Sequence, residues 1–354
     1  MQWRRRNGSV SRGLLGWAYE HGLMNHAIGL RRSAITVLCY HRIGSATSSS
    51  TSGYIGNISA TPENFERQCE YICSHFTPIG VSDLSESISR PERLPPRPIV
   101  VTFDDGYKDN AEMAWPILRK RVIPAIVFLV TDHIGTDRPL LCDYVAYCFQ
   151  QTKRTFANVA PLGPTYLQTS GDRGRATAAW LARTKALPAS ARWPAAKALR
   201  SSLDVTVPDS AFWGLYLSWD DVRRLASEGM EFGGHTRTHP ILAKMPIARA
   251  RAEIAGSHER IRAELGQPPV AFAYPNGSRG DFDVAHERAV RDAGYSVAFS
   301  IEAGPMSIAE IRRRPMAIRR IYIGIDDNMP RFAAKLTGAY RLMQSQPFPK
   351  VSLY

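Results

Sequence analysis

The sequence predicts an α/β protein with a parallel sheet or a β/α barrel, because short β-branched apolar runs alternate with amphipathic helical patterns. Its 354 residues, 44% of them hydrophobic, are enough to bury a substantial core, which excludes a disordered chain and a small disulfide-linked scaffold. No apolar run reaches the roughly 18 residues that a membrane-spanning helix needs. The five cysteines, an odd number, do not form a disulfide framework, and we expect them to be buried as small hydrophobic side chains.

Seven short segments are expected to be the strands of this sheet. Each is rich in β-branched, aromatic or small apolar residues, as buried parallel strands are. They are residues 35–40, 98–103, 123–130, 230–234, 270–274, 295–300 and 318–323. The longer stretches between them leave room for the helical crossovers that parallel strands require.

The helices between these strands are recognised by their ends. Thr61 and Pro62 suit the N-cap and the first position of one helix, and Ser218 and Asp283 suit the N-caps of two others. A fourth helix ends before Gly266, a residue that readily adopts the left-handed conformation found there. The first helix is expected to bury a stripe of side chains, namely Phe65, Cys69, Ile72, Cys73 and Phe76.

The chain divides into a basic N-terminal segment at 1–33, a main domain at 34–330, and a C-terminal helix and tail at 331–354. Arginines at 4–6 begin the first segment, but no uninterrupted apolar stretch follows them, so we expect no cleaved signal peptide. This favours the cytoplasm or the inner face of a membrane. The segment is expected to be helical, either packed on the domain or lying on a membrane surface as an amphipathic helix.

Residues 137–217 interrupt the alternation of strands and helices. They combine Ala- and Arg-rich helical sequence with scattered prolines and aromatic residues. An insertion of this length predicts a lid or a subdomain on the substrate side. Trp213, Tyr216 and Trp219, at or just after its end, are either packing residues or a stacking surface for a sugar ring.

The net charge of +13 favours an anionic partner, such as a membrane surface, an acidic glycan or a lipid-linked sugar. No nucleic-acid-binding module is recognisable, so nucleic acid is not expected as a partner. The Arg-rich tracts at 173–200 and 312–320 are expected to be solvated faces.

Two strand ends carry residues that together predict a metal site. Asp104 and Asp105 follow the strand at 98–103, and His235 and His239 follow the strand at 230–234. Neutral imidazoles at that spacing in one turn are able to bind the same metal ion. Two histidines and one carboxylate leave coordination positions open, which is typical of a catalytic rather than a structural site.

Two further strands end in polar residues, in Tyr40-His41-Arg42 and in Tyr274-Pro275-Asn276-Gly277. The carboxyl ends of parallel barrel strands meet on one rim, where the loops build the active site. We therefore expect six side chains on that rim: His41, Asp104, Asp105, His235, His239 and Asn276.

At these residues the sequence resembles the polysaccharide deacetylase family, also called NodB-homology or carbohydrate esterase family 4. The matching motifs are Thr102-Phe103-Asp104-Asp105-Gly106-Tyr107 and His235-Thr236-Arg237-Thr238-His239-Pro240. The resemblance covers about 35–130 and 215–325. It implies a distorted, incomplete (β/α) barrel, here with a long helical insertion, that removes acetyl groups from sugars with a divalent metal.

The resemblance also implies roles for individual residues. Asp105, His235 and His239 would bind the metal, most often Zn²⁺ and otherwise Co²⁺, Ni²⁺ or Fe²⁺, and Asp104 would be the general base. The backbone N–H of Asn276 would stabilise the oxyanion. Pro275 and Tyr107 would lie on the substrate side of the same motifs, and Trp219 is an accessory candidate.

The chain departs from the family pattern at three motifs. Ala273 stands where the family has an arginine that braces the base, the fourth motif is not evident, and no histidine follows His286 to act as the acid. In the biofilm poly-N-acetylglucosamine deacetylases, which the chain also resembles, the acid motif lies at the N-terminal end of the domain. His41 occupies the equivalent position and is expected to be the general acid, with a structural histidine as the alternative; Arg320 is a candidate for the missing brace.

The expected function is therefore the metal-dependent removal of N-acetyl groups from amino sugars of a polysaccharide or lipid-linked glycan. Water activated by the metal would attack the acetamide, with Asp104 as base and His41 as acid. Three alternatives stay open at this point. They are an O-acetyl esterase on an acetylated polysaccharide, an inactive carbohydrate-binding relative, and a non-haem iron oxygenase, which also uses two histidines and a carboxylate.

Overall fold

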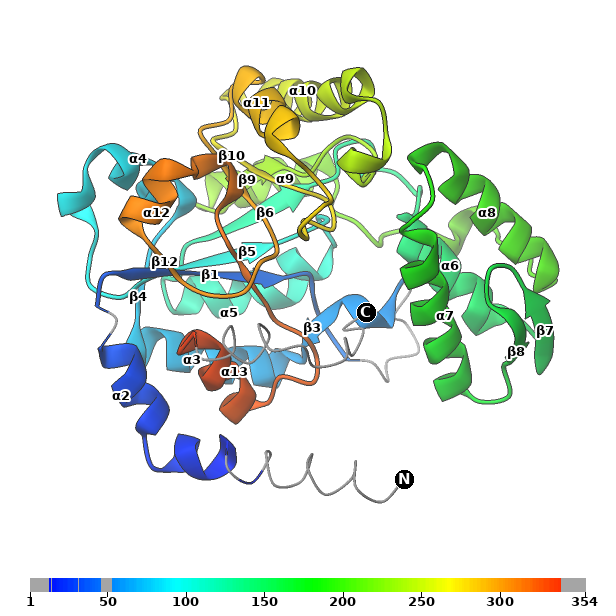
Figure 1. The fold of residues 1–354 in the computed structure, drawn as a ribbon, viewed down its shortest axis with the longest axis horizontal. Helices are drawn as coiled ribbons and strands as arrows, with labels where there is room; N and C mark the ends of the chain where they lie inside the picture. Colours follow the sequence, from blue (N-terminus) through cyan, green and yellow to red (C-terminus); the bar gives the residue numbers. More distant parts are fainter. Residues whose placement is uncertain (1–12, 14, 31, 46–52, 339–354) are drawn as a thin grey trace.

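One curved sheet forms the centre of the protein. The computed structural model describes residues 13, 15–30, 32–45 and 53–338 (Figure 1). The strand order is β11-β10-β9-β6-β5-β1-β12, with β13 also paired to β1 and β4 to β5, and every pairing except β1 with β12 is parallel. The strands are β1 Ala34–Tyr40, β4 Thr77–Pro78, β5 Pro98–Phe103, β6 Ala125–Leu129, β9 Glu231–Gly234, β10 Ala271–Ala273, β11 Val297–Phe299, β12 Met306–Ser307 and β13 Ile321–Tyr322.

The sheet curls into an incomplete barrel. Between its two ends, among the described residues, only an isolated bridge joins Phe299 of β11 to Ile318, just ahead of β13. Every residue of β5 and β6 is buried, as expected for parallel strands covered on both faces. All seven predicted strands are present, most of them shorter than predicted, so the predicted α/β barrel class is confirmed.

The predicted helix ends are also confirmed. Thr61 caps α3 (Pro62–His75), Ser218 caps α9 (Trp219–Ser227), and Asp283 caps α11 (Val284–Asp292), each side chain accepting a backbone N–H of the first turn. The helix α10 (Ile247–Leu265) ends at Gly266, whose φ is 72°. The remaining helices of the main domain are α4 Val81–Ser89, α5 Trp115–Lys120, α12 Ile308–Arg313 and α13 Met329–Leu336.

The expectation for the cysteines is wrong at one position. Cys39, Cys69 and Cys148 are buried and Cys142 is partly buried, but Cys73 is exposed. Four residues turn an α-helix by slightly more than a full revolution, so Cys73 is displaced around α3 from the stripe that contains Cys69.

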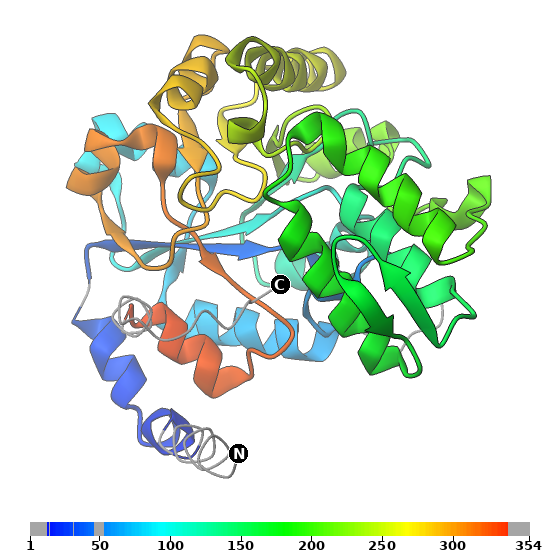
Figure 2. The ribbon, with the colours of Figure 1, turned by 45° about the vertical axis from the view of Figure 1, so that its right-hand side comes forward.

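The insertion forms a helical subdomain beside the barrel. It contains α6 Leu141–Gln151, a hairpin of β7 Phe156–Val159 and β8 Gly163–Tyr166, α7 Ser170–Thr184 and α8 Ala189–Ser202. It lies at the end of the sheet toward which β1 points, coloured green (Figure 1, Figure 2). The predicted substrate-side insertion therefore borders the carboxyl ends of the strands.

The described part of the N-terminal segment packs on the outside of the domain. Met24 and Ile28 of α2 (Leu23–Gly29) are buried, and α2 contacts α3 and α13. Trp17, Leu23 and Leu30 remain exposed. The basic start at 4–6 and the tail from 339 lie outside the described residues.

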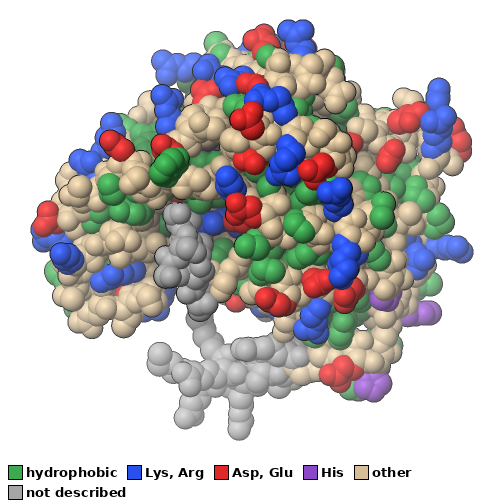
Figure 3. All heavy atoms as spheres, turned by 180° about the vertical axis from the view of Figure 1, so that it is seen from behind, with side chains coloured by type: hydrophobic (Ala, Val, Ile, Leu, Met, Phe, Trp, Pro, Cys, Tyr) green, Lys and Arg blue, Asp and Glu red, His purple; other side chains and the backbone are tan. Residues whose placement is uncertain are grey.

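Positive charge is spread over the surface. On the face opposite to that of Figure 1, Lys and Arg side chains alternate with Asp and Glu side chains rather than forming one basic patch (Figure 3). Among the described helices, none combines the length and the apolar character needed to cross a membrane.

Candidate functional site

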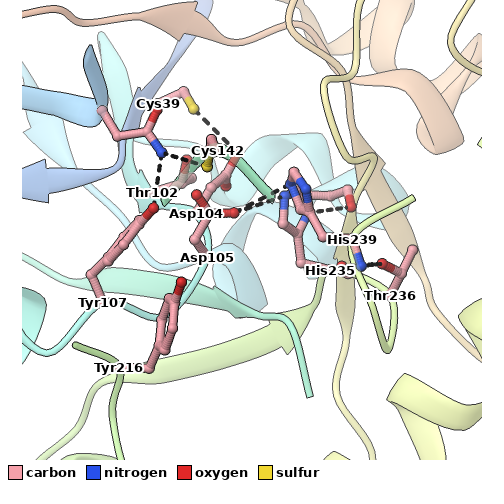
Figure 4. A network of polar contacts seen from close by, with 12 residues as sticks. Cys39, Thr102, Asp104, Asp105, Tyr107, Cys142, Tyr216, His235, Thr236 and His239 are labelled. Atoms are coloured by element: carbon pink, nitrogen blue, oxygen red, sulfur yellow. Dashed lines mark hydrogen bonds and ion pairs between the residues drawn. The ribbon is translucent and has the colours of Figure 1, made fainter. Parts of the chain in front are cut away.

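Asp105, His235 and His239 converge at the carboxyl ends of β5 and β9. Nε2 of His239 lies 3.3 Å and Nε2 of His235 lies 3.6 Å from Oδ1 of Asp105. One ligand atom from each residue lies within 4.8 Å of the other two (Figure 4). Three donors from two strand ends therefore face one point.

The chemistry of these donors fits a divalent cation. Nδ1 of His235 lies 2.7 Å from the carbonyl oxygen of Ala273, so Nδ1 carries the proton and Nε2 presents its lone pair toward Asp105. Oδ1 of Asp105 is buried and has no hydrogen-bond partner among the described residues. A buried carboxylate oxygen without a donor beside two imidazole nitrogens is a set that Zn²⁺ and related ions bind.

The electrostatics of the three residues support this reading. Burial and the neighbouring Asp104 raise the pKa of Asp105 well above its usual range. Burial also lowers the pKa of His235, and burial together with His235 lowers the pKa of His239. A cation at the centre would favour the ionised carboxylate and the neutral imidazoles, which are the forms that bind metal.

Backbone strain is concentrated at this site. Of the seven non-glycine residues with positive φ in the described chain, four lie here: Asp105, Thr236, His239 and Asn276, with φ between 59° and 76°. L-residues rarely adopt this conformation, and such strain persists where the surrounding structure imposes it. At Asp105 the turn separates the two neighbouring carboxylates, so that Asp104 and Asp105 have different partners.

Asp104 is paired with Arg320. Nη1 and Nη2 of Arg320 donate to the two carboxylate oxygens at 2.6 Å and 2.8 Å, and both side chains are fully buried. Arg320 also donates to the Thr102 hydroxyl and to the carbonyl of Ser300. Burial by itself raises the pKa of Asp104, but the Arg320 guanidinium, with smaller contributions from the histidines, lowers it well below the usual range. Asp104 is therefore ionised.

His41 follows β1 and faces the same cavity. Its ring lies edge-on to that of Tyr322, at 5.6 Å between centroids, and its Nδ1 is buried with no hydrogen-bond partner among the described residues. Burial lowers the pKa of His41 to about 4; Asp104 opposes this shift, and Arg320 and His235 reinforce it. His41 is consequently a neutral imidazole at neutral pH in the metal-free site.

A cavity of about 110 Å³ joins these groups. All six residues predicted for the barrel rim line it: His41, Asp104, Asp105, His235, His239 and Asn276. The insertion supplies part of the wall, with Leu141, Cys142, Leu181, Lys185 and Arg192. The Asn276 amide bonds to Lys185 through Oδ1 and to Asp281 through Nδ2, which links the insertion to the β10 loop.

Three residues predicted to lie on the substrate side do not line the cavity in this structure. Tyr107 is fully buried, and its hydroxyl donates to Asp143 at 3.0 Å. Pro275 is buried and does not line the cavity. Trp219 is only 9% exposed, because it lies on the inner face of α9 against the core.

Of the two roles considered for Trp213, Tyr216 and Trp219, the structure favours packing for Tyr216 and Trp219. Tyr216 is buried and bonds to Asp143, and Trp213 is 78% exposed without lining a described cavity near the site. Trp193 of α8 instead lines a cavity next to the cluster of Asp105, His235 and His239, called the metal-type cluster below. The sequence offered no signal that distinguishes these tryptophans, because the packing of the insertion decides which of them faces the site.

The two Arg-rich tracts are not wholly solvated faces. Arg320 is completely buried, and Lys185 and Arg192 are partly buried in the cavity wall. Lys185 and Arg192 were missed as site residues, because an Ala- and Arg-rich helix looks like a solvent-exposed one in sequence.

Known proteins are similar to this chain in the region that contains most of these residues. The model of the family described as polysaccharide deacetylase matches residues 92–298, which include Asp104, Asp105 and both metal-type histidines but not His41 or Arg320. The poly-β-1,6-N-acetyl-D-glucosamine N-deacetylase of Staphylococcus aureus (strain MSSA476) is 29% identical over 114 residues, 30% of this chain and 39% of that protein. The enzyme of the same name from Staphylococcus epidermidis is 30% identical over 121 residues, 32% and 41% of the two chains. Each match thus spans less than half of the relative's length.

Solved structures share the fold. The deacetylase PplD of Streptococcus pyogenes, in complex with acetate, superposes with a TM-score of 0.54 at 16% identity over 88% of this chain and 98% of its own. IcaB from Ammonifex degensii superposes with a TM-score of 0.53 at 18% identity over 86% of this chain and 97% of its own. At such identities the similarity concerns the architecture.

Proposed function

Because the chain belongs to the polysaccharide deacetylase family, we propose that it is a metal-dependent hydrolase that removes N-acetyl groups from the amino sugars of a polysaccharide or a lipid-linked glycan. The observation that carries this proposal is the cluster of Asp105, His235 and His239 in one cavity with an ionised Asp104. The names of the staphylococcal relatives support an N-acetylated amino sugar as the substrate.

Asp105, His235 and His239 would hold the cation through Oδ1 and the two Nε2 atoms. When bound, such a cation lowers the pKa of a coordinated water and polarises a carbonyl oxygen as a Lewis acid. The chain's own residues supply the proton transfers and the orientation of the substrate.

Asp104 is the proposed general base. Its pairing with Arg320 keeps the carboxylate ionised and fixes its direction toward the cavity. An ionised carboxylate next to the attacking water accepts the proton that the water loses, and assistance of this kind contributes about 10²–10⁴-fold in rate. Arg320 acts through Asp104 and is a positioning residue.

His41 is the proposed general acid for the leaving amine. Its imidazole is neutral in the resting site, and negative charge that develops on the attacked carbonyl raises its proton affinity. The ring then takes up one proton from solvent and donates it to the departing nitrogen as the C–N bond breaks, because the nitrogen would otherwise leave as an unstable anion. The backbone N–H of Asn276, at the cavity wall, is the proposed donor to the oxyanion.

The test is acetate release by the purified protein from short N-acetylglucosamine oligomers, with added Zn²⁺ or Co²⁺ and with a chelator. We expect metal-dependent acetate and an equal amount of free amine, abolished by Asp104→Asn and retained by the exposed control Asp220→Asn. Acetate without amine, from an O-acetylated glycan only, would identify an esterase instead. Sugar binding without acetate release from any substrate would identify an inactive binding relative.

We further propose that the N-terminal helix contacts the inner surface of a membrane. Trp17, Leu23 and Leu30 are exposed in a segment whose Met24 and Ile28 pack on the domain, and amphipathic helices bind anionic bilayers through such residues. Co-sedimentation with anionic vesicles is expected for the full chain and should weaken in the double variant Trp17→Ala, Leu23→Ala. Equal sedimentation of both proteins would reject the contact.

A further inference from the structure

A second, larger cavity adjoins the proposed catalytic site. It measures about 420 Å³ and lies between the start of α8 and the segment at 238–253. Leu141, Arg192 and His239 line both this cavity and the catalytic one, so the two share a wall at the metal-type cluster. The second cavity therefore lies directly beside the place where an N-acetyl group would bind.

Arg192 is the cation that faces both cavities. It is partly buried, and its Nε is buried with no hydrogen-bond partner in the described part of the chain. Burial lowers the pKa of Arg192, and the more distant Cys142 and Asp281 offset that shift only through space. A guanidinium whose Nε has lost water and gained no partner is suited to bind an anion, because guanidinium groups bind carboxylate and phosphate with two parallel hydrogen bonds.

The rest of the lining adds positive charge. Lys244 and Arg249 line the cavity, and neither makes an ion pair among the described residues. Glu253 is the acidic group of the lining, and it accepts hydrogen bonds from the N–H groups of Arg237 and Thr238 and from the Thr238 hydroxyl. The carboxylate is thus already satisfied, and the cationic side chains remain available.

Trp193 lies beside Arg192 in the same cavity. It is 37% exposed, and its indole is held edge-on against the ring of Tyr144 at 5.4 Å. A partly exposed indole in the wall of a cavity is able to stack on the apolar face of a sugar ring. The cavity therefore pairs a sugar platform with a cationic group on adjacent residues.

We propose that the substrate carries an anionic group, a carboxylate or a phosphate, next to the N-acetylated sugar, and that Arg192 binds this group in the second cavity while Trp193 stacks on the sugar that bears it. The inference rests on the proposed function, since it assigns the substrate of the same site. Arg192 is a specificity-determining residue in this proposal, and the hydrolytic step is unchanged.

The experiment compares three substrates that contain N-acetylglucosamine. They are a neutral tetramer, a tetrasaccharide in which N-acetylglucosamine alternates with glucuronate, and N-acetylglucosamine linked through pyrophosphate to a short prenyl chain. The last two distinguish a carboxylate from a phosphate as the bound anion. Wild type, Arg192→Gln, Arg192→Lys and Lys197→Gln are assayed for kcat and KM. Lys197 lies exposed on the same helix and outside both cavities. Lys197→Gln therefore removes one positive charge, as Arg192→Gln does, without changing either cavity.

We expect wild type and Lys197→Gln to favour one anionic substrate by about tenfold in kcat/KM, mainly through KM, as one charged hydrogen-bonded contact provides. Arg192→Gln should bring the ratio between anionic and neutral substrates close to one, and Arg192→Lys should restore part of it. The preference should also weaken with salt. A ratio unaffected by Arg192→Gln, or a wild type without preference, overturns the inference and leaves the deacetylase proposal intact.

Equilibrium binding of the same compounds separates the two proposals if no acetate is released. Tighter binding of an anionic compound that depends on Arg192 would support the second cavity as an anion site and reject deacetylation of these sugars. Equal binding of all three compounds by wild type and Arg192→Gln would overturn the anion site.

Discussion

Arg320 forms two hydrogen bonds with Asp104, at 2.6 Å and 2.8 Å, across 216 residues of chain. The arginine lies just ahead of β13, which pairs with β1, whereas the family's bracing arginine belongs to the motif in which this chain has Ala273. An arginine thus reaches Asp104, the proposed base, from another segment of the chain. This pairing makes Asp104 an ionised, oriented carboxylate within a fully buried environment.

Removing Arg320 should destabilise the protein strongly. Arg320→Met leaves the buried Asp104 carboxylate unpaired, and breaking a buried ion pair in this way typically costs about 3–5 kcal/mol. Denaturant unfolding measures the loss. The double variant Arg320→Met, Asp104→Asn should be more stable than the single one, because no buried charge is left alone. A single variant as stable as wild type would contradict the pairing.

Substitutions of Asp104 and His235 should affect metal binding and turnover differently. Asp104→Asn should keep the metal and lose about 10²–10⁴-fold in kcat, whereas His235→Ala should lose both. Elemental analysis of the purified proteins and acetate release give the two readouts. In thermal unfolding, Zn²⁺ at about 100 times its dissociation constant should stabilise wild type and Asp104→Asn by about 2.7 kcal/mol, and should not stabilise His235→Ala. Full activity of metal-loaded His235→Ala would reject it as a ligand.

His41 should titrate far below an ordinary histidine. In chelator-treated protein its NMR pKa is expected at about 4 rather than 6.5. Because the folded-state pKa lies below the unfolded one, protonation favours the unfolded chain, so stability is lost as the pH falls from 6.5 toward 4. His41→Gln has no group to protonate there and lacks this pH-dependent loss of stability. The difference in free energy of unfolding, variant minus wild type, should therefore rise as the pH falls from 6.5 to 4. A pKa near 6.5 would show that His41 is solvated.

Gly234 should be required for the position of His235. A Cβ at this glycine would lie 2.0 Å from the hydroxyl of Tyr295, which is itself bonded to Ser257 at 2.9 Å. Gly234→Ala should therefore cost about 1–3 kcal/mol through overpacking and weaken metal binding, as measured by unfolding and zinc titration. Tyr295→Phe removes the clashing hydroxyl, so the double variant should regain part of both. No recovery would mean that the Tyr295 ring carbon Cζ at 2.8 Å or the Ser257 hydroxyl at 3.0 Å, rather than the Tyr295 hydroxyl, excludes the methyl group.

The predictions that succeeded rest on local signals. The strand at β5 combines consecutive β-branched residues, and the helices that begin after Thr61, Ser218 and Asp283 have side-chain caps within the first turn. The positions of Asp105 and the two metal-type histidines follow from the same logic, because parallel strands deliver their carboxyl ends to one edge.

The sequence by itself determined the class of the fold, the strand ends and the meeting of the six rim residues in one cavity, since periodicity, caps and motif spacing act over a few neighbouring residues. Only the tertiary structure decided that Arg320 reaches Asp104, that Tyr107 and Trp219 turn into the core, and that Arg192 and Trp193 of the insertion line the cavity beside the site. These contacts join segments far apart in the chain, and a side chain's direction there depends on the packing of whole elements, which no local pattern encodes.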